Sequence, residues 1–464
     1  MQKMKNGKKV LSVCLSLAMA AGMLSTSAFA SWNVYGGSNN HNAVVTEAPT
    51  APDKSGLDSY IQLHCTGSGW DGVDNVPVLQ TVNGTTYAYV LYDGYGASGA
   101  LVAKIRCAEN GGSSIVWTTD PYGTEGTSLN AKGGFQLSTP YLDDKGTPDD
   151  ASDDTLYVGT ISQYDDYEGG EWLTGTGSKV MALTGLDQNK PTVTNVLTGI
   201  NGQINTPITT DGTYLYFGTW PGGSNAGTYY QVKLSDYSVK TFTPDSYGFY
   251  WAGAVSDGTN VYFGSDNGLL YWRSIADFDT TGGVLDLTDV ASDAGNVRST
   301  VMMDEDGFLY FTTQGGYLWC CFYDGGLKVY WNAKLGATST STPTKVGDRI
   351  YVGYYSGFNA GGVQCVTVSF DEEENVVTSV APVASGFPVQ GSIVVMGDGT
   401  GTDYLYFNTN AQKGAGYCYS YDGGKTGSKV WGTTGDTYAL GGMAIDNGYA
   451  VFGNDYNHLY VVHD

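Results

Sequence analysis

Apolar and polar residues alternate in short runs along most of the chain, which predicts β-strands joined by tight turns. One run, of the form apolar–Tyr or Phe–apolar and often closed by Gly, recurs eight times after a first run of similar pattern. The eight copies lie at residues 87–90, 156–159, 215–218, 261–264, 309–311, 350–353, 405–407 and 450–453. Asn-Gly, Asp-Gly or Gly-Asp turns separate the two runs and are typical of β-hairpins. No helical periodicity interrupts the repeat, which excludes Rossmann and TIM-barrel folds.

The spacing of the copies, roughly 40 to 70 residues, is that of one four-stranded blade per repeat. A single blade cannot bury both of its faces, whereas a ring of blades covers all but short edges. The sequence therefore predicts an all-β fold, an eight-bladed β-propeller formed by residues 31–464. The last copy ends the chain after three strands, so we expect an N-terminal strand at about 31–36 to complete the last blade. Residues 46–56, with Pro49 and Pro52, would then connect this strand to the first blade.

Residues 1–30 have the pattern of a secretory signal peptide. Four lysines precede an uncharged apolar stretch at residues 10–23, and Ala28-Phe29-Ala30 supplies a small-x-small cleavage motif before Ser31. The stretch is too short for a stable membrane span. We therefore expect a secreted, extracellular protein without membrane insertion, with association with the cell wall left open.

Charge narrows the range of partners. Loss of the four leader lysines would lower the net charge from −24 to −28, which disfavours nucleic acid and anionic lipid. Abundant glycine (67) and tyrosine (36) fit strands and tight turns.

The six cysteines outside the leader permit 15 pairings, and the sequence does not choose among them. No CxxC motif occurs and the four histidines are scattered, so no metal site is predicted.

Several segments resemble the repeats of quinoprotein-type (PQQ-like) propellers. "VYFGSDNGLLYW" (261–272) and "VFGNDYNHLYVV" (451–462) have the strand–turn–Leu-Tyr pattern of that family, and "GGSSIVWTT" (111–119) and "GSKVWGTT" (427–434) resemble its outer strand. The opening "SWNVYGGSNNHNAVV" is similar to the start of secreted members. The resemblance covers nearly all of residues 31–464. It implies the fold more strongly than an activity, because many members are non-catalytic scaffolds or adhesins.

The resemblance also implies an alternative function, that of a quinone-dependent dehydrogenase. Such enzymes hold calcium and a tricarboxylated quinone in the axial funnel with carboxylates, an Asn and an Arg, and use an Asp as base. Of the four arginines here, only Arg298 precedes a first strand, where it can point into the funnel. Some of these enzymes join adjacent cysteines at the cofactor. Cys320-Cys321 instead lies in an expected third strand, whose successive side chains point to opposite faces, and packing between blades is the favoured interpretation.

The sequence disfavours two further chemistries, calcium binding and hydrolysis. The acidic run at residues 143–154 offers oxygen ligands to calcium but lacks the spacing of an EF-hand, so a solvated hairpin turn is favoured. No Gly-x-Ser-x-Gly or HExxH motif is present, and most carboxylates fall in turns that the repeat explains. The sequence therefore favours a protein without catalytic residues or cofactor.

The loops between second and third strands carry the candidate binding residues. They are long at residues 92–100, 162–178, 220–228, 354–362 and 410–416, and short in three blades. Aromatic rings beside polar groups suit stacking on sugars or docking of a protein. The candidates are Tyr92, Tyr95, Tyr164, Tyr167, Trp172, Trp220, Tyr354, Tyr355 and Phe358. The alternative is that these rings pack back onto the blades of a tyrosine-rich chain.

Together these observations predict a secreted, non-catalytic propeller that binds a glycan or a cell-surface protein through one loop face. A quinone-dependent dehydrogenase and a structural surface-layer component are the alternatives.

Overall fold

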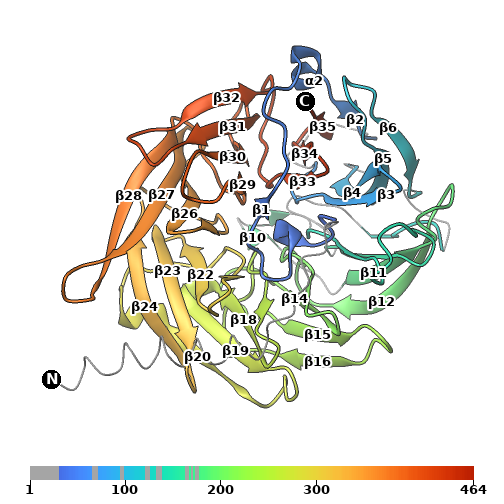
Figure 1. Cartoon of the computed structure of the whole chain (residues 1–464). Helices are drawn as coiled ribbons and strands as arrows, with labels where there is room; N and C mark the ends of the chain where they lie inside the picture. Colours follow the sequence, from blue (N-terminus) through green and yellow to red (C-terminus); the bar gives the residue numbers. More distant parts are fainter. Residues whose placement is uncertain are drawn as a thin grey trace.

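The computed structural model describes residues 31–64, 72–94, 99–120, 126–131, 138–161, 167–168, 171–172 and 177–464, with the backbone alone at 167–168 and 171–172. Eight sheets radiate around a central axis, each forming one blade (Figure 1). The predicted eight-bladed β-propeller is therefore confirmed. Each of the eight sequence copies lies in the second strand of its blade.

Every blade runs from its first strand at the axis to its fourth strand at the outer wall. Blades 1 to 4 are formed by β3 (Val78–Val82), β4 (Thr85–Asp93), β5 (Ala100–Arg106) and β6 (Ser114–Thr118); β7 (Tyr141–Asp143), β8 (Thr155–Gly159), β11 (Ser178–Thr184) and β12 (Thr192–Ile200); β13 (Thr209–Thr210), β14 (Tyr214–Gly218), β15 (Tyr229–Lys233) and β16 (Val239–Phe242); β17 (Val255–Ser256), β18 (Asn260–Ser265), β19 (Leu269–Ser274) and β20 (Gly282–Asp286). Blades 5 to 8 are formed by β21 (Met302–Met303), β22 (Leu309–Thr313), β23 (Tyr317–Tyr323) and β24 (Leu327–Lys334); β25 (Thr344–Val346), β26 (Arg349–Ser356), β27 (Ala360–Phe370) and β28 (Val376–Ser385); β29 (Val394–Met396), β30 (Asp403–Asn408), β31 (Gly416–Tyr421) and β32 (Ser428–Gly432); β33 (Ala444–Asp446), β34 (Tyr449–Gly453), β35 (His458–Val462) and β2 (Ile61–Gln62).

The hairpins between first and second strands form because their turn residues tolerate positive φ. Asn83 and Gly84 have φ of 48° and 76°, and Asn447 and Gly448 have φ of 48° and 75°. This is the left-handed conformation of two-residue hairpin loops, which Asn and Gly adopt at least cost. Alternate strand residues then face the two neighbouring blades, and the apolar ones form clusters between successive blades.

An N-terminal strand completes the last blade, but it is not the predicted one. The strand β2 (Ile61–Gln62) pairs antiparallel with β35 as the outer strand of blade 8. The prediction that residues 31–36 form this strand was therefore wrong. Residues 46–56 lead toward β2 through the short helix α2 (Lys54–Asp58), and not directly into the first blade. The carboxylate of Asp464 accepts hydrogen bonds from the amides of Thr50 (3.0 Å) and Ala51 (2.6 Å), which ties this connector to the C-terminus.

Residues 31–45 lie in the axial channel, and we call them the N-terminal plug. In Figure 1 this blue segment crosses the middle of the ring and then runs outward between blades 7 and 8 to α2. Within it, η1 (Tyr35–Gly37) is a turn of 3₁₀ helix and β1 (Val44–Val45) pairs parallel with β29.

The plug supplies acceptors to the inward edges of the first strands. The bonds run from the amide of Leu79 to the carbonyl of Trp32 (2.8 Å), Leu142 to Asn33 (2.8 Å), Met303 to Asn40 (3.0 Å) and Val395 to Ala43 (2.9 Å), and from the amide of Lys345 to the side-chain oxygen of Asn42 (2.8 Å). The buried His41 ring lies between the carbonyls of Tyr35 (2.9 Å) and Ala254 (2.7 Å). Unpaired strand edges inside a protein are costly. This explains why Trp32 to Val34 lie at the axis and are not available for the outer wall.

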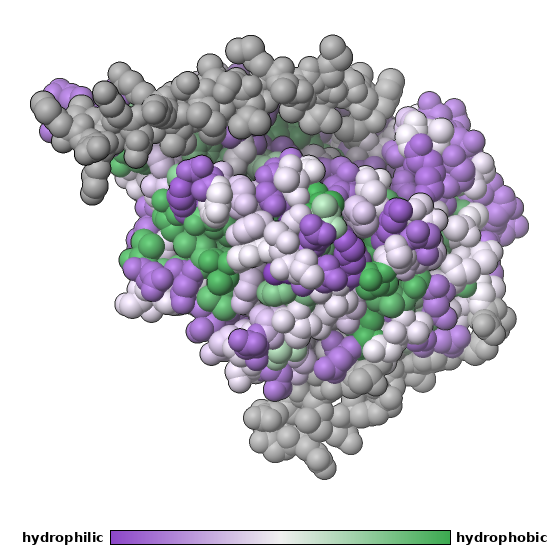
Figure 2. Space-filling view, turned by 90° about the horizontal axis from the view of Figure 1, so that it is seen from below, coloured by the Kyte–Doolittle hydropathy of each residue, from purple (hydrophilic) through white to green (hydrophobic). Residues whose placement is uncertain are grey.

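The outer wall is chemically mixed. Seen from the edge where β16 and β20 lie in Figure 1, green apolar patches are separated by white and purple surface (Figure 2). Among the described residues, no helix has the length and apolar character needed to cross a membrane. Residues 1–30 lie outside the described part, so the signal peptide stays a prediction.

Candidate functional site

The axial pocket opens on the face that carries the loops between second and third strands and between blades, which we call the loop face. All eight blades contribute to it, because its lining residues directly precede the first strands. They are Asp74, Asn75, Val76, Thr139, Asn205, Pro207, Trp251, Arg298, Thr300, Thr340, Gln390, Gly391, Leu440, Gly441 and Gly442, together with Tyr35 of the plug. The cavity volume is about 60 Å³.

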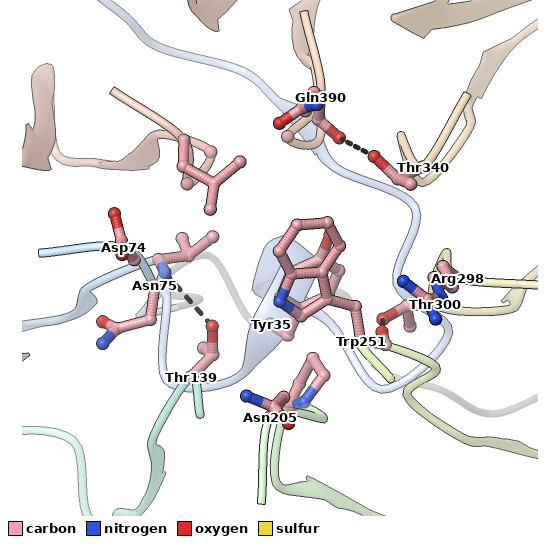
Figure 3. A pocket seen from close by; sticks show the side chains of 16 residues that line it. Tyr35, Asp74, Asn75, Thr139, Asn205, Trp251, Arg298, Thr300, Thr340 and Gln390 are labelled. Atoms are coloured by element: carbon pink, nitrogen blue, oxygen red, sulfur yellow. Dashed lines mark hydrogen bonds between the residues drawn. The ribbon is translucent and has the colours of Figure 1, made fainter. Parts of the chain in front are cut away.

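Tyr35 and Trp251 occupy the middle of this pocket (Figure 3). The Tyr35 hydroxyl lies 2.9 Å from the hydroxyl of Thr342, and burial raises the pKa of the phenol. Threonine hydroxyls link neighbouring blades around it: the amide of Val76 donates to Thr139 (3.1 Å) and that of Thr300 to Thr342 (3.1 Å). The Ser/Thr residues that precede several first strands, such as Thr139 and Thr342, therefore join neighbouring blades at the axis.

The pocket is too small for a typical organic ligand. Sites for small molecules and cofactors usually enclose about 300–1,000 Å³. The observed volume has room for water or for the tip of a side chain. The plug closes the axis below it, so the axial pocket has no room for a ligand larger than this.

A charged and aromatic cluster lies beside the pocket. Arg298 makes a two-pronged ion pair with Asp266, through Nε and one terminal nitrogen at 2.7 Å each. Burial opposes the charge of Arg298, but the bond to Asp266 outweighs it and raises the pKa of the guanidinium. The Trp220 indole N–H also donates to Asp266 (3.2 Å), and the Arg298 guanidinium lies 4.5 Å from the ring centre of Tyr250. Arg298 reaches the funnel as the sequence suggested, but Asp266 already neutralises it.

The structure separates the predicted binding residues into groups. Tyr92 is fully buried in β4, in the core between blades 8 and 1, so its assignment to a ligand-binding loop was wrong. The strand continues to Asp93, and its alternation turns Tyr92 inward. Tyr95 and Tyr164 lie outside the described residues. Tyr167 and Trp172 are register partners in the hairpin β9 (Tyr167–Glu168) and β10 (Glu171–Trp172).

The remaining four candidates lie on the loop face. Trp220 is half-buried and held by Asp266, with its ring edge-on to Tyr250. Residues 354–362 are mostly strand: Tyr354 and Tyr355 lie in β26, opposite Gly362 and Gly361. Both tyrosines are half-buried. Phe358, at the tip of this hairpin, is 47% exposed.

Sequence reasoning missed several rings of this face. Trp251, Tyr438 and Tyr456 lie in loops, and Tyr60 immediately precedes β2. Tyr456 belongs to a short loop and was passed over for that reason, while Tyr60 and Tyr438 fall outside the repeat. Only their single-residue identity marked them, and in a chain with 36 tyrosines that carries little information.

The fold has many counterparts among solved structures. Neither a protein-family model nor a curated protein sequence matches the chain. BamB from Moraxella catarrhalis has a TM-score of 0.51 at 13% identity, over 88% of this chain and 97% of that one. Saccharomyces cerevisiae Sqt1 has a TM-score of 0.51 at 12% identity (89% and 99%), and quinohemoprotein alcohol dehydrogenase from Comamonas testosteroni 0.53 at 11% (94% and 77%). The chain shares their β-propeller fold.

Because one of these structures is a quinohemoprotein dehydrogenase, the residues that line the funnel are compared with those that a quinone cofactor needs. Among the described lining residues, Asp74 is the one carboxylate and Arg298 the one cation, already paired with Asp266. A tricarboxylated quinone with calcium needs several free carboxylates and an available guanidinium, in far more space than about 60 Å³. The residues of this funnel do not fit that cofactor.

The adjacent cysteines also lie away from the funnel. Cys320 and Cys321 are free thiols in β23 and are buried in separate clusters on its two sides. Cys365 and Cys418 have similar buried places in β27 and β31. Burial raises the pKa of all four thiols, as expected for packing residues. The interpretation of Cys320-Cys321 as packing between blades is confirmed.

The acidic run between β7 and β8 forms a solvated turn, as favoured from the sequence. Asp143 pairs with Lys145, the Asp144 carboxylate accepts the amide of Gly146 (3.0 Å), and Asp150 accepts the hydroxyl of Ser152 (2.6 Å). These are the local bonds of Asx turns. In the described part of the chain, no group of three or more His, Cys, Asp or Glu side chains is placed to hold a metal ion.

Proposed function

We propose that this chain is an exported, non-catalytic binding propeller that holds a glycan or protein partner on its loop face. The observation that carries the proposal is the contrast between the axis and that face. The axial pocket is small and closed below by the plug, whereas half-exposed and exposed aromatic rings stand on the surrounding loops. Such a molecule offers a surface for recognition, and its axial pocket is too small to enclose an organic substrate.

The aromatic residues support binding because several stand beside fixed polar groups. The Trp220 and Tyr250 rings adjoin the Arg298–Asp266 pair, and the Tyr355 hydroxyl accepts a hydrogen bond from Gln314 (3.4 Å). Rigid rings with polar neighbours give contact area and orientation at a low entropy cost. The rigid sheets behind them would keep this surface preformed, which reduces the cost of binding.

The test compares two exposed phenylalanines of the same blade. Phe358 lies on the loop face, and Phe370 (61% exposed), at the far end of β27, lies on the opposite face. The fluorescently labelled chain is applied to a glycan array and to envelope fractions of the producing cells. We expect Phe358→Ala to weaken capture about five- to tenfold, the loss of about 1–1.5 kcal/mol of ring contact, and Phe370→Ala to leave it unchanged.

Equal capture by both variants, or loss only with Phe370→Ala, would move the partner off the loop face and overturn the proposal. Turnover of a bound glycan or peptide by the wild-type chain would overturn its non-catalytic part. Thermal melting of both variants shows whether either change reports unfolding instead of binding.

A further inference from the structure

A row of aromatic rings runs over the loop face of blades 6 to 8 and ends at the outer strand of blade 8. The Phe358 ring lies 5.5 Å edge-on from Tyr438, in the connection between blades 7 and 8. The carbonyl of Tyr438 accepts the amide of Asp455, the residue before Tyr456. Tyr456 lies 6.0 Å from the His458 ring, on which Tyr60 stacks at 3.7 Å. We call Phe358, Tyr438, Tyr456 and Tyr60 the aromatic row.

Three members of the row expose a large ring to solvent. Tyr60, Phe358 and Tyr456 are 47%, 47% and 45% exposed. They come from three separate places in the sequence, and the ring closure through β2 brings Tyr60 beside blade 8. Exposing large rings has a cost in water, so a linked set of them marks a contact surface.

Fixed carboxylates flank the row. Asp436 accepts hydrogen bonds from the His458 ring (2.6 Å) and from the Asn454 amide (2.7 Å), which hold its orientation, and 31% of its side chain is exposed. Asp58 accepts the Thr434 hydroxyl (2.5 Å) on the same side of the blade. Oriented carboxylates accept hydrogen bonds from neighbouring sugar hydroxyls and repel polyanions.

The surroundings of the row are not those of a protein-docking patch. The exposed large aliphatic side chains of the described residues lie in outer strands, in β1 or just after η4 (Leu287–Asp289). They are Val44, Ile115, Val116, Val239, Val284, Val290, Val377, Val380 and Val430. None of these exposed aliphatic residues belongs to the loops that carry Phe358, Tyr438 and Tyr456, whereas the core of a protein interface is a continuous apolar patch. Flat rings set among polar groups match the alternating apolar and hydroxylated faces of sugars.

We infer that the aromatic row binds an extended neutral polysaccharide, with successive sugar units stacked on Phe358, Tyr456 and Tyr60 and hydroxyls bonded to Asp436. The inference rests on the proposed function and names the partner class for that face. A net charge of −24, together with the local carboxylates, disfavours uronate- or phosphate-bearing polymers.

The experiment is affinity electrophoresis of the purified chain through native gels that contain xylan, mixed-linkage glucan, glucomannan or, as the charged probe, polygalacturonate. We expect retardation by at least one neutral polymer and none by polygalacturonate. Tyr456→Ala and Tyr60→Ala should each raise the dissociation constant about tenfold, and the double variant should abolish retardation. Phe370→Ala is the matched control and should migrate as wild type.

Each contrary result has its own meaning. Retardation by a neutral polymer that survives the double variant would place the glycan elsewhere and overturn the inference. So would stronger retardation by polygalacturonate. Capture of a protein through Phe358, with no retardation by any polymer, would overturn the inference and leave the proposed function standing.

Tyr60 adjoins the closing strand, so its removal can also loosen the fold. The conservative Tyr60→Phe keeps the stacked ring and should retain most of the affinity. Tyr456→Ala changes an exposed loop side chain and should melt within a degree or two of wild type. Loss of retardation in Tyr456→Ala at unchanged melting temperature therefore assigns the effect to binding.

Discussion

Most tyrosines of the repeat stabilise the blades and do not bind ligands. The hydroxyl of the second-strand tyrosine donates to the aspartate of the preceding hairpin in three successive blades: Tyr216 to Asp211 (2.8 Å), Tyr262 to Asp257 (2.5 Å) and Tyr310 to Asp304 (3.0 Å). This bond satisfies a buried hydroxyl and fixes the turn at once. The sequence shows the Asp-Gly turn and the tyrosine, but not that they are bonded to each other.

The local sequence also does not show which of the predicted binding rings are buried and which are exposed. Tyr92 and Phe358 were predicted on equal grounds, as rings beside glycine in a long loop. The first is fully buried in a strand that extends further than expected, and the second is 47% exposed at a hairpin tip. Strand ends are set by pairing with a neighbour, and that information is not local in the sequence.

One buried carboxyl predicts a pH effect. Asp154 is almost inaccessible, its one bonded oxygen accepts from Gln80 (2.5 Å), and burial raises its pKa from 3.8 to about 6. Because the pKa is raised in the folded state, the group contributes its full stability below pH 4 and loses it as pH rises through 6. Asp154→Asn should therefore stabilise the fold at pH 7.5, by about 1–2 kcal/mol after allowance for solvent screening, and change little at pH 4.

Chemical denaturation at both pH values checks this prediction. Asp153→Asn, at the exposed neighbouring position of the same turn, is the control and should show a much smaller gain, because burial of Asp154 contributes more to its raised pKa than the charge of Asp153 does. A gain of equal size at both pH values would show that the amide improves packing and that titration of Asp154 is not the cause.

At the scale of the elements, the sequence correctly predicted that an N-terminal strand completes the last blade. It assigned this strand to the wrong segment. Residues 31–36 have the aromatic and β-branched residues of a strand, whereas β2 has two paired residues and no alternation long enough to detect. The carbonyls of the plug accept hydrogen bonds from several blades in turn, so the contacts of the plug leave no periodic pattern in its sequence. Hydrophobic periodicity detects elements that pair along their length and misses those that contact many partners in turn.

The plug should contribute strongly to stability. Trp32 is 3% exposed, belongs to the core of blades 8 and 1, and packs closely against Gly37. Trp32→Ala should lower the free energy of unfolding by about 3–5 kcal/mol, because it leaves a cavity at the axis and releases carbonyls that cap first strands. Urea unfolding measures the change. Asn39→Ala, at an exposed position in the same segment, should be nearly neutral, and equal losses in the two variants would show that the plug is not held by its buried residues.

At the scale of the whole molecule, the number of blades follows from counting repeats, and ring closure follows from an incomplete last repeat. The path of the chain through the axis does not follow from either, because it depends on contacts between residues 31–45 and strands far away in the sequence, such as Ala43 with Val395 in β29. Closure makes blade 8 a composite of both ends of the chain, joined by only two register pairs in β2 and by the Asp464 contacts. This seam, between β35 and β2 in blade 8, joins a strand near the end of the chain to one near the start of its described part, so no loop connects the two strands directly.

The seam should open before the rest of the ring. Leu63 follows β2, is fully buried, and donates its amide to the carbonyl of Asn457 (2.9 Å). Leu63→Ala should cost about 2–5 kcal/mol and, in native-state hydrogen exchange, speed the amides of β35 and β3 while those of blades 4 and 5 stay protected. Leu215→Ala, an equally buried change in blade 3, should speed exchange around β14 and leave β35 as in wild type. If Leu63→Ala raised exchange uniformly around the ring, the blades would unfold only together, and the seam would have no local stability of its own. Faster exchange confined to blades 8 and 1 instead follows from the geometry, since only two register pairs and no connecting loop hold β2 against β35.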